Sequence, residues 1–477
     1  MTKIIFSQTN IESLIAKKQL NITDLLEQFE RSDLVSTARY RDSSGLPWGS
    51  WKNVVTALDA FLLEQNWVFK PNKLLIFNVN VAYFAPSSFI KAQPEDILNI
   101  LQNCTQTQLN FVFTQPIIVN YFLKLLIQQG NHILERITDK LLLSFLQALT
   151  QNKNVSSTEE IQICQNFLKI HNLDHRSISR IFLEARIKSL QKISTTLPKT
   201  SKLKVALLIC GQLRGFEYTL PRFAKKFAHL GLIDAYVSTW EEVGYTRFNL
   251  QNTYRIFDKP TCDFIIENKD ALDLSKFDEE IYRYTAQIYS PERIQEILNN
   301  QLSWCNNLKI NLKNHQEYPY NKMSNAEKMY YHNSYWIETL NEDYFKQYDL
   351  IIKIRPDYFF KDDAPISVKD LSSKNLLTDT PNYLFQEWGF GLGDQLWIGM
   401  PEPMLSLLSC HKRDSISYEY MYTFYKQEPY QGHLNCGFQA WLSGLSIVEN
   451  NAALLKSRLA SIRLINFAEF QQMNVHI

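Results

Sequence analysis

The sequence predicts an α/β protein in which a Rossmann-like mixed sheet, flanked by helices, follows a mainly α-helical domain. Two short apolar runs support the sheet, Val205–Ile209 and Leu350–Ile354, because buried strands have this composition. From residue 203 onward such runs alternate with helical patterns, which is typical of an α/β sheet. From Pro94 to about Leu190 the spacing of apolar residues is helical throughout.

Length and composition restrict the class of protein. A chain of 477 residues is expected to form two or more domains. Hydrophobic residues make up 45% and charged residues 21%, which is typical of a globular protein. Lys and Arg number 50 against 49 Asp and Glu, so there is no basic field and we expect no nucleic-acid partner.

Cysteine usage and hydropathy bear on the compartment. The seven cysteines lie far apart and form no Cys-x-x-Cys pair, so we expect reduced thiols and no zinc knuckle. No run of about 18 apolar residues predicts a membrane span, and the first ten residues turn polar too early for a signal peptide. We therefore expect a cytoplasmic protein without a transmembrane segment, for which peripheral membrane association stays open.

Residues 1–195 form the predicted helical domain. Its first part predicts helices over Ile11–Phe29 and Val54–Leu63 and a strand over Leu74–Tyr83. Clearer helical signals begin at Pro94, where a proline and two acids suit a first helical turn.

Three further helices are expected in this domain. Apolar residues from Ile133 to Leu149 predict one face of a single long helix. Ser157–Glu160 has the pattern of a capping box before the next helix, and a last helix covers Ser177–Leu190. These helices predict a bundle or solenoid-like unit, which we expect to bind an acceptor substrate or a partner, or to form a homo-oligomer.

A boundary follows these helices. Ser194–Lys202 is small, polar and contains a proline, which is the composition of a linker. We place the linker at 196–202 and the second, α/β domain at 203–477.

The second domain opens with a strand, a glycine-containing turn over Gly211–Gly215 and a helix, as a nucleotide-binding sheet does. Ile233–Trp240 predicts the second strand, and Phe264–Glu267 predicts a third. The following residues, roughly fifty, contain no strong strand signal.

A helix over Ser324–Leu340 leads into the strand Leu350–Ile354. This strand ends at Arg355-Pro356-Asp357, because proline lacks the N–H that a central strand needs. Arg355 and Asp357 therefore follow the carboxyl end of a core strand, where open α/β sheets bind ligands. The alternative is an Arg–Asp pair that only ties down a loop.

The remaining elements lie after residue 386. Three glycines at 389–393 permit close approach of the backbone to a ligand, and Asp394 opens a strand whose core residues are 396–398. A helix after Gln431–Gly437 and a strand at 446–448 complete the pattern.

Three short motifs, taken in order, carry a resemblance to a known family. They are Gly211-Gln212-Leu213-Arg214, Tyr348-Asp349 with Arg355-Pro356-Asp357, and Gly393-Asp394-Gln395-Leu396-Trp397. Together they resemble bacterial GT-A type glycosyltransferases of the surface-polysaccharide kind, over roughly residues 203–450. Residues 1–195 take no part in the resemblance.

The resemblance implies a nucleotide-sugar donor, with a UDP-sugar favoured, bound at the carboxyl edge of the sheet. The acceptor would be a capsule- or lipopolysaccharide-type glycan or a protein. GT-A enzymes hold a divalent cation with an Asp-x-Asp motif, and here Arg355 replaces the first acid. We expect Asp357 to ligate Mn²⁺ or Mg²⁺. The alternative is that Arg355 offsets the diphosphate charge directly.

Placement within this resemblance gives the other expected roles. Lys328, with Ser324 and Asn325 in the first turns of a helix, favours a phosphate or ribose contact, although a capped surface helix explains the same residues. The expected donor contacts are Gly211, Gln212, Arg214, Thr239, Trp240, Lys328 and Arg355.

Asp394 is the expected catalytic residue on the acceptor side, because an inverting enzyme needs a carboxylate that takes the acceptor proton. Glu387 and His433 are further candidates. Whether the reaction inverts or retains the anomeric configuration stays open.

A second hypothesis is a non-catalytic interaction protein, in which a helical scaffold joins a degenerate nucleotide-sugar-binding domain. The missing first acid and the large helical domain favour it. An oxidoreductase is disfavoured, because the chain has neither a Gly-x-Gly-x-x-Gly motif nor a P-loop.

Overall fold

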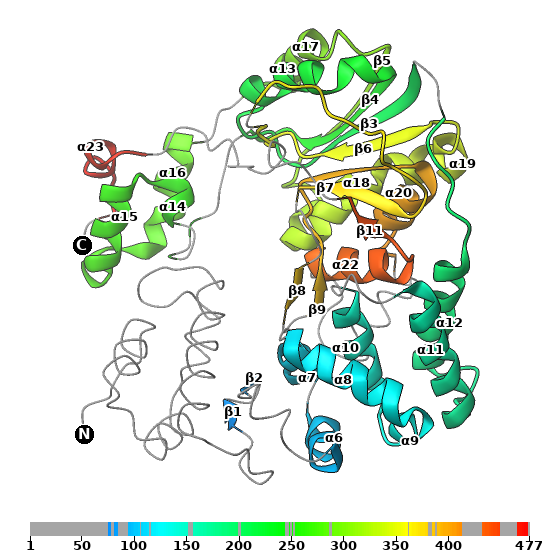
Figure 1. Cartoon of the computed structure of the whole chain (residues 1–477). Coiled ribbons are helices and arrows are strands. Elements are labelled where there is room, and N and C mark those ends of the chain that lie inside the picture. Colours follow the sequence, from blue (N-terminus) through cyan, green and yellow to red (C-terminus); the bar gives the residue numbers. More distant parts are fainter. Residues whose placement is uncertain are drawn as a thin grey trace. The chain divides into compact units, whose positions relative to one another are not determined.

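The computed structural model describes most of the chain from residue 94 onward and two short strands before it (Figure 1). The described residues are 75–77, 81–83, 94–104, 106–113, 116–150, 156–198, 202–243, 248, 250, 253–285, 289–360, 362–379, 384–386, 389–412, 432–448 and 465–475. The helices expected at Ile11–Phe29 and Val54–Leu63 lie outside these residues, as does Glu387, so these stay predictions.

The described residues fall into two compact units, each of which is taken by itself below. Unit 1 combines the chain up to Gln191 with Leu384–Gly391. Unit 2 begins at Lys192 and holds the described remainder. Within the predicted linker, Thr196 forms an antiparallel bridge with Ser372 and so belongs to unit 2.

Unit 1 is mainly helical where it is described. Its helices are α6 (Pro94–Asn103), α7 (Gln106–Phe113), α8 (Pro116–Gln129), α9 (Asn131–Leu134), α10 (Asp139–Leu149), α11 (Ser157–His171) and α12 (Ile178–Gln191). Unit 1 also contains two antiparallel strand pairs. They are β1 (Leu75–Phe77) with β2 (Val81–Tyr83), and β8 (Leu384–Gln386) with β9 (Gly389–Gly391). Its core includes Phe113, Phe122 and Phe145, whose rings pack against one another.

Three expectations for unit 1 are wrong in detail. The long helix from Ile133 to Leu149 is two helices, because Thr138 caps α10 with its side chain, which accepts from the N–H of Leu141. The capping box before α11 uses Ser156 and Glu159, one residue earlier than predicted. The single strand expected over Leu74–Tyr83 is the β1–β2 hairpin.

A capping-box residue of the prediction has a different role. Glu160 is buried and forms a bidentate ion pair with Arg186 of α12, at 2.7 Å and 3.0 Å. This pair connects α11 to α12, whereas the cap of α11 is formed by exposed side chains.

Unit 2 is built on a seven-stranded mixed sheet, which confirms the predicted α/β class. The strands are β3 (Leu203–Cys210), β4 (Gly231–Trp240), β5 (Asn307–Lys313), β6 (Leu350–Ile354), β7 (Asn375–Thr378), β10 (Leu396–Gly399) and β11 (Ser446–Ile447). Their order is β11-β7-β10-β6-β3-β4-β5. Only β10 runs antiparallel to its neighbours; every other described pair in this sheet is parallel.

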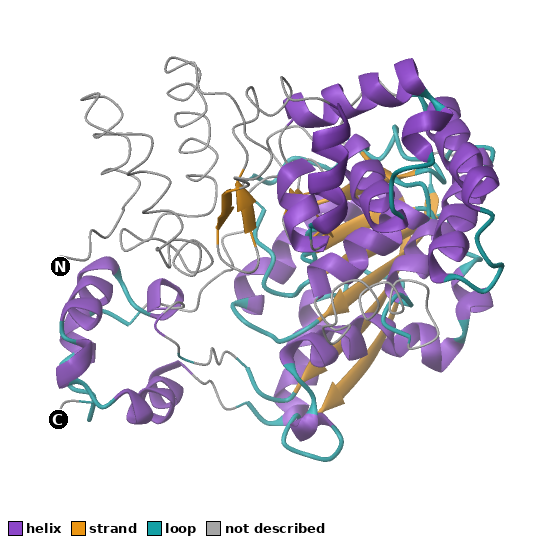
Figure 2. Ribbon diagram, turned by 90° about the horizontal axis from the view of Figure 1, so that it is seen from below, coloured by secondary structure: helices purple, strands orange, loops and turns teal. Residues whose placement is uncertain are grey.

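Helices cover both faces of this sheet (Figure 2). On one face α13 (Phe216–Phe227) and α17 (Pro291–Gln301) pack on the apolar residues of β3, β4 and β6. On the other face lie α18 (Asn325–Leu340), α20 (Pro401–Leu408) and α22 (Gly432–Leu442). The short segments beside them are the 3₁₀ turns η1 (Ala228–Leu230) and η5 (Tyr320–Lys322) and the helix α19 (Glu342–Phe345).

A second apolar cluster of unit 2 is helical. It comprises α14 (Thr253–Ile256), α15 (Lys259–Glu267), the 3₁₀ turns η3 (Lys269–Ala271) and η4 (Leu274–Lys276), α16 (Phe277–Thr285) and α23 (Phe467–Phe470). Phe257, Phe277 and Phe470 pack edge to face at its centre. The helices inserted between β4 and β5 thus pack against the last described residues of the chain, 465–475.

Two expectations for unit 2 are wrong. Phe264–Glu267 is the end of helix α15, because Asp258 caps that helix and Pro260 occupies its first turn. The roughly fifty residues that showed no strong strand signal contain β5, an edge strand.

The strand order places a topological switch point between β3 and β6. From β3 the chain proceeds to β4 and β5 on one side, and it then returns to β6 on the other side. Open α/β sheets bind ligands at the carboxyl ends of two such strands. Because β10 is antiparallel, with Leu396 opposite Ile354, its amino end lies at this same edge.

Gly231, the first residue of β4, offers a test of the β3–β4 pairing. A Cβ atom there would lie 2.2 Å from the carbonyl oxygen of Leu203, and the residue has φ +143°. Gly231→Ala is expected to lower the free energy of unfolding by about 2 kcal/mol, measured by urea denaturation. Gly130→Ala, which has a positive φ but nothing within 4 Å, is the control. Equal effects would contradict a steric origin.

Candidate functional site

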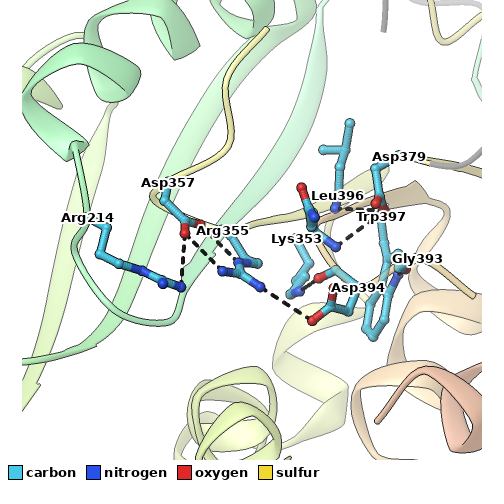
Figure 3. A network of polar contacts seen from close by, with 10 residues as sticks. Arg214, Lys353, Arg355, Asp357, Asp379, Gly393, Asp394, Leu396 and Trp397 are labelled. Atoms are coloured by element: carbon cyan, nitrogen blue, oxygen red, sulfur yellow. Dashed lines mark hydrogen bonds and ion pairs between the residues drawn. The ribbon is translucent and has the colours of Figure 1, made fainter. Parts of the chain in front are cut away.

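Three loops that are far apart in the sequence meet at the carboxyl edge of β3 and β6 (Figure 3). Arg214 follows β3, Arg355 and Asp357 follow β6, and Asp394 precedes β10. The three motifs that carry the resemblance therefore contribute side chains to one polar cluster. Gly211 connects the turn after β3 to β4, since its N–H donates to Ser238 O at 3.0 Å.

Asp357 is at the centre of the ion pairs. Its side chain is 1% exposed, and both of its oxygens accept hydrogen bonds from Arg355, from Nε and Nη2, each at 2.9 Å. Arg214 Nη2 lies 3.1 Å from Asp357 Oδ2. The two guanidinium groups are about one-fifth exposed, at 20% for Arg214 and 22% for Arg355.

The ion pairs set the charge of Asp357. Burial would raise the pKa of its carboxyl group, but the guanidinium groups of Arg355 and Arg214 outweigh burial and the pKa is lowered. Burial would lower the pKa of Arg355, whereas Asp357 raises it above its usual value. All three side chains are therefore charged at neutral pH.

Asp394 occupies a turn that is fixed by another acid. Its carboxylate lies 3.7 Å from Arg355 Nη1. Asp379, at the end of β7, accepts from the backbone N–H groups of Gln395 and Leu396, both at 3.3 Å. A Cβ on Gly393 would lie 2.5 Å from Asp379 Oδ1, so glycine is needed for the turn to pack this closely. Burial raises the pKa of Asp379, and Asp394 adds to that shift.

Lys353 is a buried cation beside this turn. Its ammonium group donates to the backbone oxygen of Asp394 and lies 4.7 Å from the centre of the Trp397 ring. The side chain is fully buried, and burial lowers its pKa. Sequence reasoning missed Lys353. The signal was present, because a lysine within the apolar strand Leu350–Ile354 is rarely buried without a partner.

The ends of β4 and β5 carry aromatic and polar groups next to α18. Trp240 stacks on Tyr331 with ring centres 5.7 Å apart. Ser238 Oγ is 2.9 Å from His332 Nδ1. Thr239 is buried and faces the opposite side of the sheet, because side chains alternate along a strand.

His332 was not among the predicted site residues. It is 2% exposed, and burial lowers its pKa to about 3, with Lys328 adding to the effect. The ring is therefore neutral at pH 7. Its Nε2 is buried and has no hydrogen-bond partner among the residues that the structure describes. No feature of the sequence singles out this histidine, since its burial depends on the packing of α18 on the sheet.

Lys328 lies in the first turns of α18, as predicted, where Ser324 and Glu327 form a capping box. Near it, His315 Nε2 lies 3.1 Å from Glu242 Oε2. Burial raises the pKa of Glu242 and lowers that of His315; Lys328 opposes the first shift and adds to the second.

The remaining predicted residues are placed only in part. Gln212 lies in the turn after β3 and is half-buried. His433 is in the first turn of α22, but its side chain is outside the described residues.

A cavity of about 620 Å³ lies elsewhere in unit 2. Tyr348 and Asp349, which precede β6, and Met400, which follows the antiparallel β10, line it. These positions are at the amino edge of the parallel strands, so the cavity is separate from the Arg–Asp cluster.

Comparison with known proteins adds no relative: no family model, curated protein or solved structure matches the chain. Among the described helices, none is both long and apolar enough to cross a membrane.

Proposed function

We propose that the protein is a glycosyltransferase that moves a sugar from a nucleotide-sugar donor, with a UDP-sugar favoured, to a glycan or protein acceptor. One observation carries the proposal. Three separate motifs, which lie between residues 211 and 397, supply Arg214, Arg355, Asp357 and Asp394 to the switch point of an open α/β sheet, where such sheets bind nucleotides.

The donor side would be formed by the guanidinium groups and the β4 end. Arg214 and Arg355 are partly exposed, and planar guanidinium groups match the oxygens of a diphosphate. Gly211 in the turn after β3 has φ +120°, a backbone conformation that favours glycine, and its missing Cβ would lie 3.8 Å from Pro356 Cδ, so this turn packs closely on the loop after β6. Trp240, at the end of β4, would wall the nucleoside pocket, and Lys328 lies in the first turns of the neighbouring helix α18.

The acceptor side would be Asp394. A carboxylate there can take the proton of an acceptor hydroxyl as its oxygen attacks C1 of the sugar. Arg355 at 3.7 Å and the hydrogen bonds of Asp379 to the same turn would hold this group in place. Glu387 and His433 stay predictions.

The divalent cation also stays a prediction, and Asp357 in this arrangement does not fit it. Both of its oxygens accept from Arg355, and Arg214 is in contact with one of them. Among the residues that the structure describes, no three or more His, Cys, Asp or Glu side chains are grouped to hold a metal. We therefore assign no step to a metal bound by Asp357.

Further parts of the proposal come from the sequence. We propose that the enzyme works in the cytoplasm on a precursor of a surface glycan or on a protein. Unit 1 would bind the acceptor or a partner, or form a homo-oligomer.

Turnover of nucleotide sugars tests this function. The full-length protein is incubated with UDP-, GDP- and CMP-sugars, with and without Mn²⁺, and nucleotide release is measured. Asp394→Asn is expected to lower the rate at least about 100-fold with little change in melting temperature. Asp363→Asn, which removes only a surface pair with Lys225, is the control. No release from any donor, together with no nucleotide binding, would favour the non-catalytic interaction protein instead.

A further inference from the structure

Asp357 is engaged on both oxygens by guanidinium groups, in a geometry that leaves it little access to solvent. Arg355 takes the two oxygens as a fork, and Arg214 contacts Oδ2 from the turn after β3. The side chain is 1% exposed, whereas the arginine side chains are about one-fifth exposed. A ligand that enters from solvent therefore meets the guanidinium groups before it meets the carboxylate.

We infer that Arg214 and Arg355 hold the diphosphate of a nucleoside diphosphate at this edge, and that Asp357 positions these two groups instead of binding a divalent cation. This inference rests on the proposed function, because it concerns the same donor site. It gives Asp357 a role that differs from the one implied by the resemblance.

Local charge favours an anionic ligand over a cation. Two guanidinium groups adjoin the Asp357 carboxylate and would repel a divalent cation there, and the Asp394 carboxylate, 3.7 Å from Arg355 Nη1, offsets part of only one of these two charges. Figure 3 shows these three side chains at one end of the cluster, with Lys353 and Asp394 toward the other. At that other end Lys353 donates to the Asp394 turn, so its charge is satisfied there.

Orientation is the second argument. A guanidinium group has five N–H donors in a fixed plane, and Asp357 uses only two of those on Arg355, Nε–H and one of Nη2. Because the fork fixes the plane, less side-chain entropy is lost when an oxyanion binds to the remaining donors. Asp357 thus acts on the ligand through the arginines, as a positioning residue.

The test measures binding of UDP to the full-length protein by calorimetry, in EDTA and in Mn²⁺, with GDP and CDP in parallel and UMP as a ligand without a diphosphate. We expect the Kd of the preferred diphosphate to differ less than about threefold between EDTA and Mn²⁺, and its monophosphate to bind at least about tenfold more weakly.

The variants separate the two roles of Asp357. If this residue positions the arginines, Asp357→Asn weakens diphosphate binding about tenfold even in EDTA. If it is a metal ligand, the variant has no effect in EDTA. Because Asp357 is buried, Arg214→Gln is a second variant with the same expected loss, and Asp363→Asn serves as the unaffected control.

The outcomes are distinguishable. Diphosphate binding that requires Mn²⁺, whether or not it is lost in Asp357→Asn, would overturn the inference and leave the proposed function standing. No binding of UDP, GDP or CDP in either condition would overturn the inference, and together with no turnover of any nucleotide sugar it would overturn the proposed function as well. Binding in EDTA that is weakened in Asp357→Asn and in Arg214→Gln supports both.

Discussion

Replacing Arg355 with methionine is expected to lower the free energy of unfolding by about 3 kcal/mol at pH 7, because it leaves a buried carboxylate with one fewer partner. Asp357 is 1% exposed and receives two hydrogen bonds from Arg355. Methionine retains much of the apolar stem, so the loss is mainly electrostatic. Urea denaturation at pH 7 measures the effect.

The pH dependence identifies the cause. The pKa of Asp357 is lowered in the folded protein, so its ion pairs stabilise the fold above the unfolded pKa of about 3.9. This stabilisation is lost as the pH falls through the folded pKa. The deficit of Arg355→Met should therefore shrink below about pH 4. Arg293→Met, which breaks an exposed pair with Glu296, should have a much smaller effect on the free energy of unfolding. A deficit that is unchanged at low pH would contradict the assignment.

The second large effect concerns His332. Burial lowers its pKa to about 3, whereas an unfolded histidine has a pKa of about 6.5. The unfolded state therefore binds more protons between these values, and stability falls as the pH drops through this window. From pH 6.5 to pH 5 this histidine alone should reduce the free energy of unfolding by about 2 kcal/mol.

His332→Asn isolates this contribution. The asparagine amide can keep the hydrogen bond that His332 Nδ1 makes with Ser238 Oγ, and it does not titrate. The variant is expected to lose the slope between pH 6.5 and pH 5 in urea denaturation. Ser238→Ala, which removes the hydroxyl partner of the ring but keeps His332, is the control and should keep the slope. An unchanged slope in His332→Asn would contradict the prediction.

Most central strands were predictable from the sequence because they are buried on both faces, but the interior strand β7 (Asn375–Thr378) was not predicted. The strands β3, β4, β6 and β10 all begin and end within about two residues of the predicted runs. The edge strand β5 was missed, although Leu308, Ile310 and Leu312 alternate with polar residues, which is the pattern of a half-exposed strand. The misassigned Phe264–Glu267 is too short an apolar run to separate strand from helix, and the helix start at Asp258 decides it.

The site was predictable where it lies in motifs and hidden where it depends on packing. Arg214, Arg355 and Asp357 were named from the sequence, and the structure places them in contact. Asp379 was missed, because its role arises from the pairing of β7 with β10 and from the contact with Gly393. No local pattern encodes such a partner.

Unit 1 is built from segments that are far apart in the sequence, and this has a consequence for folding during translation. Its hairpin β8–β9, which packs on α7 and α10, is translated only after most of the sheet of unit 2. The helices up to Gln191 are therefore synthesised well before the hairpin that packs on them, and most of the sheet of unit 2 is translated in between. No single proteolytic cut can release either unit intact, since a break at Gln191 leaves the hairpin on the wrong fragment.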